Sequence, residues 1–223
     1  MQSSVFTFFD RVRVINLADR PDRKREIKRD LRPLGWTPDE SDFLVASRPV
    51  VSGPFISIGA HGCFQSHARA VREAARAKES LLILEDDCSF LPEAGTYEVP
   101  DCDIFYGGWN ELAEDGDYVV GSHCMGFSRR AVQLLDSYLA AFLAAPADPK
   151  AMTEPGFDPA VKPGIDGAYV WFRRAHPELT TVFANLSFQR SSRSDVTPGR
   201  LDQISFLRTP LSVARRFKTL AAR

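Results

Sequence analysis

The sequence lacks the features that mark several classes of protein. Its 223 residues carry a formal net charge of −1, so no excess of positive charge points to nucleic acid as a partner. Its longest apolar run, residues 138–145, is far shorter than the roughly 20 residues that cross a bilayer. The first ten residues have no basic segment ahead of an apolar one, which makes a poor secretory signal. We therefore expect a cytoplasmic protein.

Cysteine is also scarce. The four cysteines lie far apart in the sequence and form no Cys-x-x-Cys pair, and they are Cys63, Cys88, Cys102 and Cys124. Without a secretory context we expect reduced core residues rather than disulfides. A hydrophobic content of 44% and a charged content of 26% are ordinary for a folded protein and exclude disorder of the whole chain.

Short apolar segments alternate with amphipathic ones along the chain. Strands or extended segments are expected at residues 12–17, 42–46, 80–84, 102–106, 118–127 and 180–185. Helices are expected at residues 21–34, 62–78, from 128 onward and at 166–174. The alternation predicts an α/β domain with a mostly parallel sheet flanked by helices. Ligands bind such sheets at the carboxyl ends of strands, which directs attention to the residues after positions 17, 84 and 106.

Three consecutive carboxylates follow the apolar strand at residues 80–84. Glu85, Asp86 and Asp87 are costly to bring together there unless positive charge compensates them. A magnesium or manganese ion shared with a diphosphate would do so, since these ions prefer carboxylate and phosphate oxygens. In an extended segment Glu85 and Asp87 point the same way, so the two could share one ligand. Asp87 would hold the metal, while Glu85 or Asp86 would reach the ribose or sugar hydroxyls. The alternative is a solvated acidic turn, which the position after a buried strand disfavours.

Four short motifs occur in a recognisable order. They are residues 14–17 with Arg20 and Arg23, residues 58–67, residues 82–87 and residues 194–196. In this order they resemble glycosyltransferase family 25, the lipooligosaccharide-type glycosyltransferases, which also include the collagen galactosyltransferases. The resemblance spans roughly residues 12 to 196.

The resemblance implies a single GT-A-like (Rossmann-like) domain, a UDP-sugar donor, Mn²⁺ or Mg²⁺, inversion at the anomeric carbon, and a glycan or glycolipid acceptor. By motif, the residues near the nucleotide base and ribose would be Asn16, Leu17, Arg20 and Arg23. Those lining the donor side would be Gly62, Cys63, Ser66 and His67. Glu85, Asp86 and Asp87 would replace the Asp-x-Asp motif, with Asp87 and Glu85 on the metal. This sequence departs from the pattern in its leading Glu and in having no histidine after His176.

Several of these residues have an ordinary structural interpretation as well. Arg20 and Arg23 would otherwise be two charges on an already charged helix. Gly62 and Cys63 would open a helix whose free N–H groups bind phosphate, with His67 one turn in, or His67 would be a core histidine. Cys63 and His67 share a helix face, and His61 is nearby, but a zinc site needs about four ligands and no partner cluster is evident.

Asp166 is the best candidate for the catalytic base. It follows a Pro-rich loop at residues 145–164 and begins a helix, where Asp is also a preferred N-cap. The weaker candidates Glu111, Asp115 and Asp117 lie in an intervening loop. Trp109 could stack on a sugar ring or pack in the core.

The C-terminal region differs in charge from the rest. We expect the catalytic domain at residues 1–189 and a basic extension at residues 190–223 with eight basic and two acidic residues. Its apolar residues have helical spacing, which suits either an anionic membrane surface or its own domain. Two other functions stay open: a catalytically silent binding module, and a metal-dependent nucleotidyltransferase, which the absence of glycine at residues 18–22 disfavours.

Overall fold

The computed structural model describes residues 4–153 and 157–190. Its centre is a six-stranded sheet in the order β2-β1-β3-β8-β5-β9. These strands are β2 (Phe43–Val45), β1 (Arg11–Asn16), β3 (Leu81–Glu85), β8 (Cys124–Phe127), β5 (Ile104–Gly108) and β9 (Thr181–Phe183). Strand β8 runs antiparallel to both of its neighbours, and the other neighbouring strands run parallel. The predicted α/β fold with a mostly parallel sheet is therefore confirmed.

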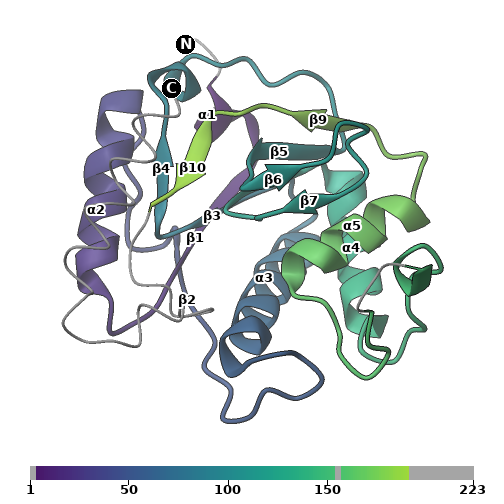
Figure 1. The fold of residues 1–223 in the computed structure, drawn as a ribbon. Coiled ribbons are helices and arrows are strands. Elements are labelled where there is room, and N and C mark those ends of the chain that lie inside the picture. Colours follow the sequence, from purple (N-terminus) through teal and green to yellow (C-terminus); the bar gives the residue numbers. More distant parts are fainter. Residues whose placement is uncertain (1–3, 154–156, 191–223) are drawn as a thin grey trace.

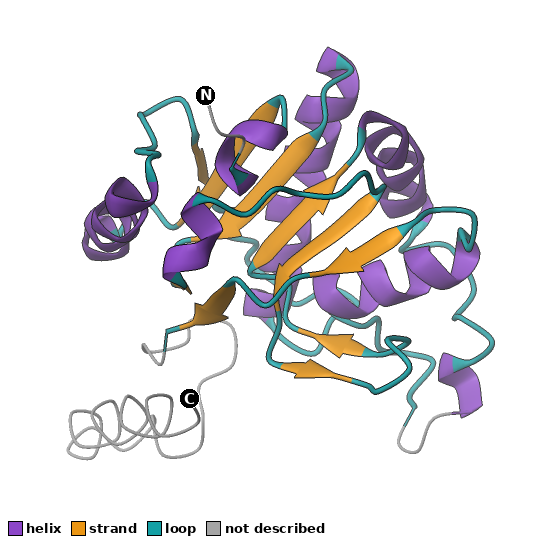
Figure 2. Ribbon diagram, turned by 90° about the horizontal axis from the view of Figure 1, so that it is seen from above, coloured by secondary structure: helices purple, strands orange, loops and turns teal. Residues whose placement is uncertain are grey.

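Helices cover both faces of this sheet (Figures 1 and 2). The helices are α1 (Val5–Phe8), α2 (Pro21–Leu31), α3 (Ile58–Ala77), α4 (Arg129–Ala141) and α5 (Ile165–Ala175). Apolar residues of α3, α4 and α5 build one core on one face, and those of α1 and α2 build a second core on the other. Short 3₁₀ turns lie at Arg32–Leu34, Pro92–Gly95 and Ala151–Thr153. None of the helices within the described ranges is long and apolar enough to cross a membrane.

The central strand β3 shows how the sequence produces this layering. Its four apolar residues are fully buried, and their side chains alternate between the two cores. Leu81 and Ile83 belong to the core under α3, whereas Leu82 and Leu84 belong to the core under α2. A strand covered on both faces has no solvent side, which explains the continuous apolar run.

Two helix starts differ from the predictions. Helix α3 begins at Ile58 rather than residue 62, because the Ser57 hydroxyl caps it by accepting from the Ala60 N–H at 3.0 Å. Helix α5 has Gly164 as its N-cap, so the interpretation of Asp166 as an N-cap is wrong. The helix predicted at residues 21–34 ends earlier, at Leu31, and a 3₁₀ turn continues it to Leu34; Gly35 ends this turn in a left-handed conformation with φ 84°, at the position where the sequence predicted the stop.

The sequence did not reveal two small two-stranded sheets. One pairs β4 (Cys88–Phe90) with β10 (Ser187–Gln189), and the other pairs β6 (Glu111–Leu112) with β7 (Val119–Val120). The first places β10, at the end of the described residues, beside β4 (Figure 1), and β4 directly follows the acidic cluster in the sequence. The motif at residues 194–196 and nearly all of the predicted basic extension lie outside the described residues. All four cysteines are free, as predicted.

Candidate functional site

A cavity of about 460 Å³ opens at the carboxyl ends of the parallel strands β1 and β3. Its walls are the end of β1, the loop at residues 46–49, the first turns of α3, and the acidic cluster. The polar and charged residues that line it are Arg23, Ser47, Arg48, Cys63, Ser66, His67, Glu85, Asp86, Asp87 and Gln189. This is the edge at which a mostly parallel sheet binds ligands.

The three carboxylates of the cluster do not project together. Glu85 is the last residue of β3 and follows the alternation of Leu81 and Ile83, so its side chain meets α3. The chain then turns at residues 86 and 87, and both aspartates meet α2 through Arg23. The prediction that Glu85 and Asp87 point the same way from an extended segment is therefore wrong.

Asp86 is held by two buried partners. Its Oδ2 accepts from Asn16 Nδ2 at 2.6 Å, and its Oδ1 lies 3.1 Å from Arg23 Nη1. Burial raises the pKa of the Asp86 carboxyl, and the charge of Arg23 and the hydrogen bond from Asn16 oppose this rise. Asn16, which the resemblance places near the nucleotide, positions a carboxylate of the cluster in the structure and is not itself among the residues that line the cavity.

Asp87 has weaker compensation. Its Oδ2 lies 3.4 Å from Arg23 Nη1, and Gln189 Nε2 donates to both carboxylate oxygens at 3.4 Å. Burial raises the pKa of Asp87 to about 7, and the negative charge of Glu85 adds to the rise. The surroundings therefore disfavour the ionised form of Asp87, and a bound cation would favour it.

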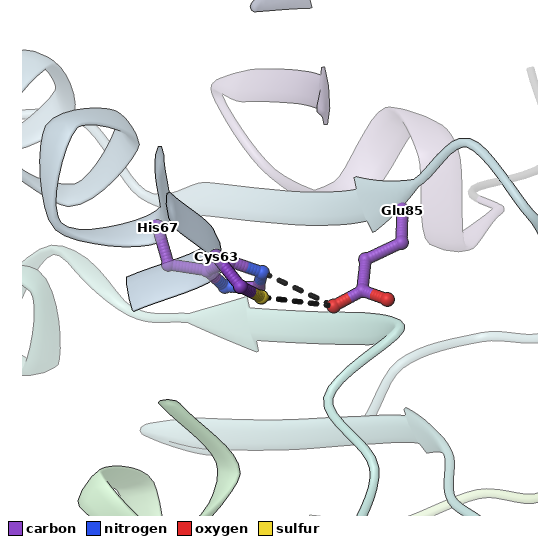
Figure 3. Close-up of side chains that lie close together, drawn as sticks. All are labelled: Cys63, His67 and Glu85. Carbon is purple, nitrogen blue, oxygen red and sulfur yellow. Dashed lines mark hydrogen bonds and ion pairs between the residues drawn. The ribbon is translucent and has the colours of Figure 1, made fainter. Parts of the chain in front are cut away.

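Glu85 meets two side chains of α3 (Figure 3). Its Oε1 accepts from the Cys63 thiol at 3.8 Å and lies 3.3 Å from His67 Nε2. Burial alone would raise the pKa of Glu85, but the hydrogen bond and charge of His67 hold it below its usual value. Among the described residues, these three form a group whose potential ligand atoms all lie within 4.8 Å of one another.

Gly62 and Ser66 join α3 to the neighbouring loop. A Cβ atom on Gly62 would lie 2.6 Å from the Ser47 carbonyl oxygen, so only glycine permits this approach. The Ser66 hydroxyl donates to the Gly62 carbonyl at 2.6 Å and accepts from the Ser47 N–H at 2.8 Å. Because α3 starts at Ile58, the prediction that Gly62 and Cys63 open a helix is wrong, and both lie one turn inside it.

The remaining predicted residues are divided between the cavity and its surroundings. Leu17 and Arg23 line the cavity, and Arg23 is only 5% exposed, which rules out its interpretation as a surface charge. Arg20 pairs with Asp22 at 2.9 Å at the start of α2. His61 contacts the Val51 carbonyl through Nδ1 at 2.9 Å and does not belong to the Cys63–His67 group.

Asp166 lies at a second cavity of about 500 Å³. This cavity is bounded by β7, the loop before α5, and α5 itself, and it shares no lining residue with the first. The two cavities approach each other at the start of α3, where Ile58, the first residue of the helix, lines the first cavity and Ile56, in the preceding loop, lines the second. The Asp166 carboxylate accepts a hydrogen bond from the Gly121 N–H at 3.4 Å.

Three functional candidates were missed in the sequence. Arg48 lines the first cavity and pairs with Asp19 at 2.8 Å. Gln189 reaches Asp87 because β10 pairs with β4, a contact between residues 102 positions apart. Arg190 donates to the carbonyl oxygen of Asp86 and pairs with Asp30 at 2.9 Å. No local signal marks such long-range partners.

Comparisons with known proteins give little further information. No protein-family model matches the chain, and no curated protein matches it. Among solved structures, the chain is similar to one described as "crystal structure of a glycosyltransferase involved in the glycosylation of the major capsid of PBCV-1". The similarity covers 78% of this chain and 80% of that chain. The TM-score is 0.44 and the sequences are 13% identical. Membership of glycosyltransferase family 25 therefore stays a prediction.

Proposed function

We propose that this chain is a glycosyltransferase that moves a sugar, galactose-like in the family it resembles, from a UDP-sugar to a hydroxyl acceptor with inversion. The acceptor would be a glycan or glycolipid such as lipooligosaccharide or another cell-surface saccharide. The observation that supports this best is the first cavity at the carboxyl ends of two parallel strands, whose lining includes three carboxylates and two arginines: Glu85, Asp86, Asp87, Arg23 and Arg48. Its volume of about 460 Å³ falls in the range of small-molecule sites.

A divalent metal fits this cavity at Asp87. Carboxylate oxygens are the donors that Mg²⁺ and Mn²⁺ prefer. Burial first, and the charge of Glu85 second, raise the pKa of Asp87, and a bound ion would favour its ionised form. When bound, the ion would stabilise negative charge on the leaving diphosphate. Glu85 would complete its shell only if its side chain turned away from His67.

Other side chains would bind the diphosphate and accept the proton of the acceptor hydroxyl. Arg23 fixes Asp86 and Asp87 in place, and Arg48 at the cavity rim would bind the diphosphate as a planar donor. Asp166, in the second cavity, would accept the proton of the attacking hydroxyl. The second cavity would then bind the acceptor, while the first binds the donor.

Two measurements on the full-length protein test this proposal. UDP and a panel of UDP-sugars are titrated by calorimetry with Mn²⁺, with Mg²⁺ and with EDTA, and slow hydrolysis of each sugar nucleotide is followed. We expect binding that requires the divalent ion, hydrolysis of one preferred donor, and loss of both in Asp87→Asn. A matched control is Asp158→Asn, which changes a carboxylate of the second cavity.

The outcomes separate the alternatives. Binding without hydrolysis or transfer would favour a catalytically silent module. Binding of nucleoside triphosphates in preference to UDP-sugars would favour a nucleotidyltransferase. UDP affinity that is unchanged in Asp87→Asn, or by EDTA, would contradict the metal-dependent scheme.

A further inference from the structure

Cys63, His67 and Glu85 form a compact cluster on the wall of the first cavity (Figure 3). Cys63 and His67 lie four residues apart on α3, which places both side chains on one face of that helix. Glu85 approaches this face from the end of β3. A thiol, an imidazole and a carboxylate that converge in this way are the three ligand types that proteins offer to zinc.

Two of the distances between these groups are close to those of a tetrahedral metal site, and the third is within 4.8 Å. Zinc bonds of about 2.3 Å to sulfur and about 2.0–2.1 Å to nitrogen or oxygen place ligand atoms about 3.3–3.6 Å apart at tetrahedral angles. The Glu85 oxygen lies 3.3 Å from His67 Nε2 and 3.8 Å from Cys63 Sγ. Only small side-chain movements would bring all three atoms onto one ion.

The surroundings of His67 are also those of a metal ligand. Its side chain is fully buried, and its Nδ1 lies 2.9 Å from the Tyr169 hydroxyl of α5. Zinc-binding histidines commonly use their second nitrogen for such a hydrogen bond, which fixes the ring orientation and the tautomer. In the bound state, Nδ1–H would donate to Tyr169 and Nε2 would be free for the ion.

The cluster is accessible from one side. Cys63 is partly exposed and all three residues line the first cavity, so a fourth coordination position would face that cavity. Three protein ligands with one open position is the arrangement of catalytic rather than structural zinc sites. We infer that Cys63, His67 and Glu85 form a three-ligand site for a zinc-class divalent cation, with its open position directed into the cavity.

Binding releases the proton of the Cys63 thiol to solvent. The proton that His67 Nε2 directs at Glu85 moves to Nδ1 where the imidazole is neutral, or leaves as a second proton where it is charged, so that a thiolate, a neutral imidazole and a carboxylate surround the ion. The site differs from the proposed Mn²⁺ or Mg²⁺ site, which is centred on Asp87 and uses oxygen donors, and Glu85 can serve only one of the two at a time because it must leave His67 to reach the other. The zinc-class site does not depend on any sugar donor, so it can be tested with the metal alone.

The test uses full-length protein freed of metal by a chelator and titrated with Co²⁺ without nucleotide. Cobalt replaces zinc in such sites, and a cysteine ligand produces a thiolate-to-cobalt charge-transfer absorption. We expect this absorption to saturate at one equivalent of Co²⁺ and to be displaced by one equivalent of Zn²⁺. Cys63→Ser should abolish it and weaken Zn²⁺ binding by more than the roughly 10–100-fold that loss of an outer-shell partner costs.

Control variants test whether the absorption comes from this cluster. Cys102→Ser removes a thiol elsewhere, His61→Ala removes a histidine from the other side of α3, and Asp87→Asn removes the neighbouring carboxylate. All three should keep the absorption. Tyr169→Phe, which deletes only the partner of His67, should weaken Zn²⁺ binding by roughly 10–100-fold.

Two results would overturn the inference. One is a folded wild-type protein, judged by its circular dichroism, that shows no charge-transfer absorption with Co²⁺. The other is an absorption that persists in Cys63→Ser or disappears equally in Cys102→Ser. Either result would reduce the cluster to a hydrogen-bond network, and neither would affect the test of UDP-sugar binding.

Discussion

The guanidinium of Arg23 bridges two carboxylates of the acidic cluster, with Nη1 3.1 Å from Asp86 Oδ1 and 3.4 Å from Asp87 Oδ2. All three side chains are at most 10% exposed. Arg23 comes from α2, whereas both aspartates follow β3, so the contact closes the cavity edge between two elements far apart in the sequence. The protein itself thus supplies part of the positive charge that the acidic run requires.

Replacing Arg23 with Gln should be strongly destabilising. The change leaves two buried carboxylates with less compensation, and breaking a buried ion pair typically costs about 3–5 kcal/mol. Urea unfolding should therefore show a lower free energy of unfolding. Arg25→Gln, two residues along on the exposed face of α2, should change it by less than about 0.5 kcal/mol. Equal stability of the two variants would show that Arg23 does not compensate the cluster.

The ion pairs of Asp117 with Arg174 and Lys150 should make the free energy of unfolding depend on pH in the acid range. Asp117 accepts from Arg174 at 2.7 Å and from Lys150 at 2.6 Å, and the hydrogen bond from Arg174 lowers the pKa of Asp117 to about 2. Its pKa in the unfolded chain is 3.8, so these ion pairs stabilise the fold above pH 3.8 and lose this effect as the pH falls toward 2.

The variant Asp117→Asn should remove the pH dependence of stability that Asp117 contributes between pH 3.8 and pH 2. After allowance for solvent screening, the loss is about 1–2 kcal/mol at pH 6, and the variant and the wild type should converge near pH 2. Urea unfolding across this pH range measures the effect. Glu114→Gln, an exposed neighbour, should follow the wild-type curve. A constant difference between Asp117→Asn and the wild type at every pH would contradict the assignment.

The order of elements could be predicted from the sequence because it depends on local patterns. The run at residues 81–84 is apolar throughout because both faces of β3 are covered, and Gly35 ends its helix segment because a left-handed φ favours glycine. The pairing of β4 with β10 could not be predicted. It joins two three-residue strands nearly 100 positions apart, and strands that short carry no periodic signal.

The candidate site was located from sequence but its geometry was not. The position of Glu85, Asp86 and Asp87 after a buried strand correctly placed them at the cavity. Which way each one points depends on the turn after Glu85 and on partners from α2 and α3, so the sequence could not separate Glu85 from the two aspartates. The same reason hid the grouping of Glu85 with Cys63 and His67.

Gly62 offers a test of the cavity wall. An added methyl group would collide with the Ser47 carbonyl at 2.6 Å and approach Pro49 Cδ at 3.2 Å, so Gly62→Ala should displace the loop at residues 46–49. We expect weaker UDP binding and a loss of about 1–3 kcal/mol in stability, typical of overpacking. Calorimetry and urea unfolding measure the two effects. Arg76→Ala, exposed near the other end of α3, should change neither, and an unaltered Gly62→Ala protein would contradict the assigned contact.

The proposed base can be separated from donor binding because the two cavities share no lining residue. Asp166→Asn keeps the size of the side chain but cannot accept a proton, so the rate of UDP-sugar hydrolysis should fall roughly 10²–10⁴-fold. UDP affinity should stay at the wild-type value, since Asp166 lies outside the donor cavity.

Asp158→Asn is the matched control for this base. It changes another carboxylate of the second cavity, one whose Oδ1 accepts from the Ala160 N–H at 2.8 Å. Its hydrolysis rate should stay within a few-fold of the wild type. Equal losses in both variants would point to a general effect of charge or folding, and full activity in Asp166→Asn would exclude Asp166 as the base. A loss confined to Asp166→Asn, with unchanged UDP affinity, would assign the second cavity to the attacking hydroxyl.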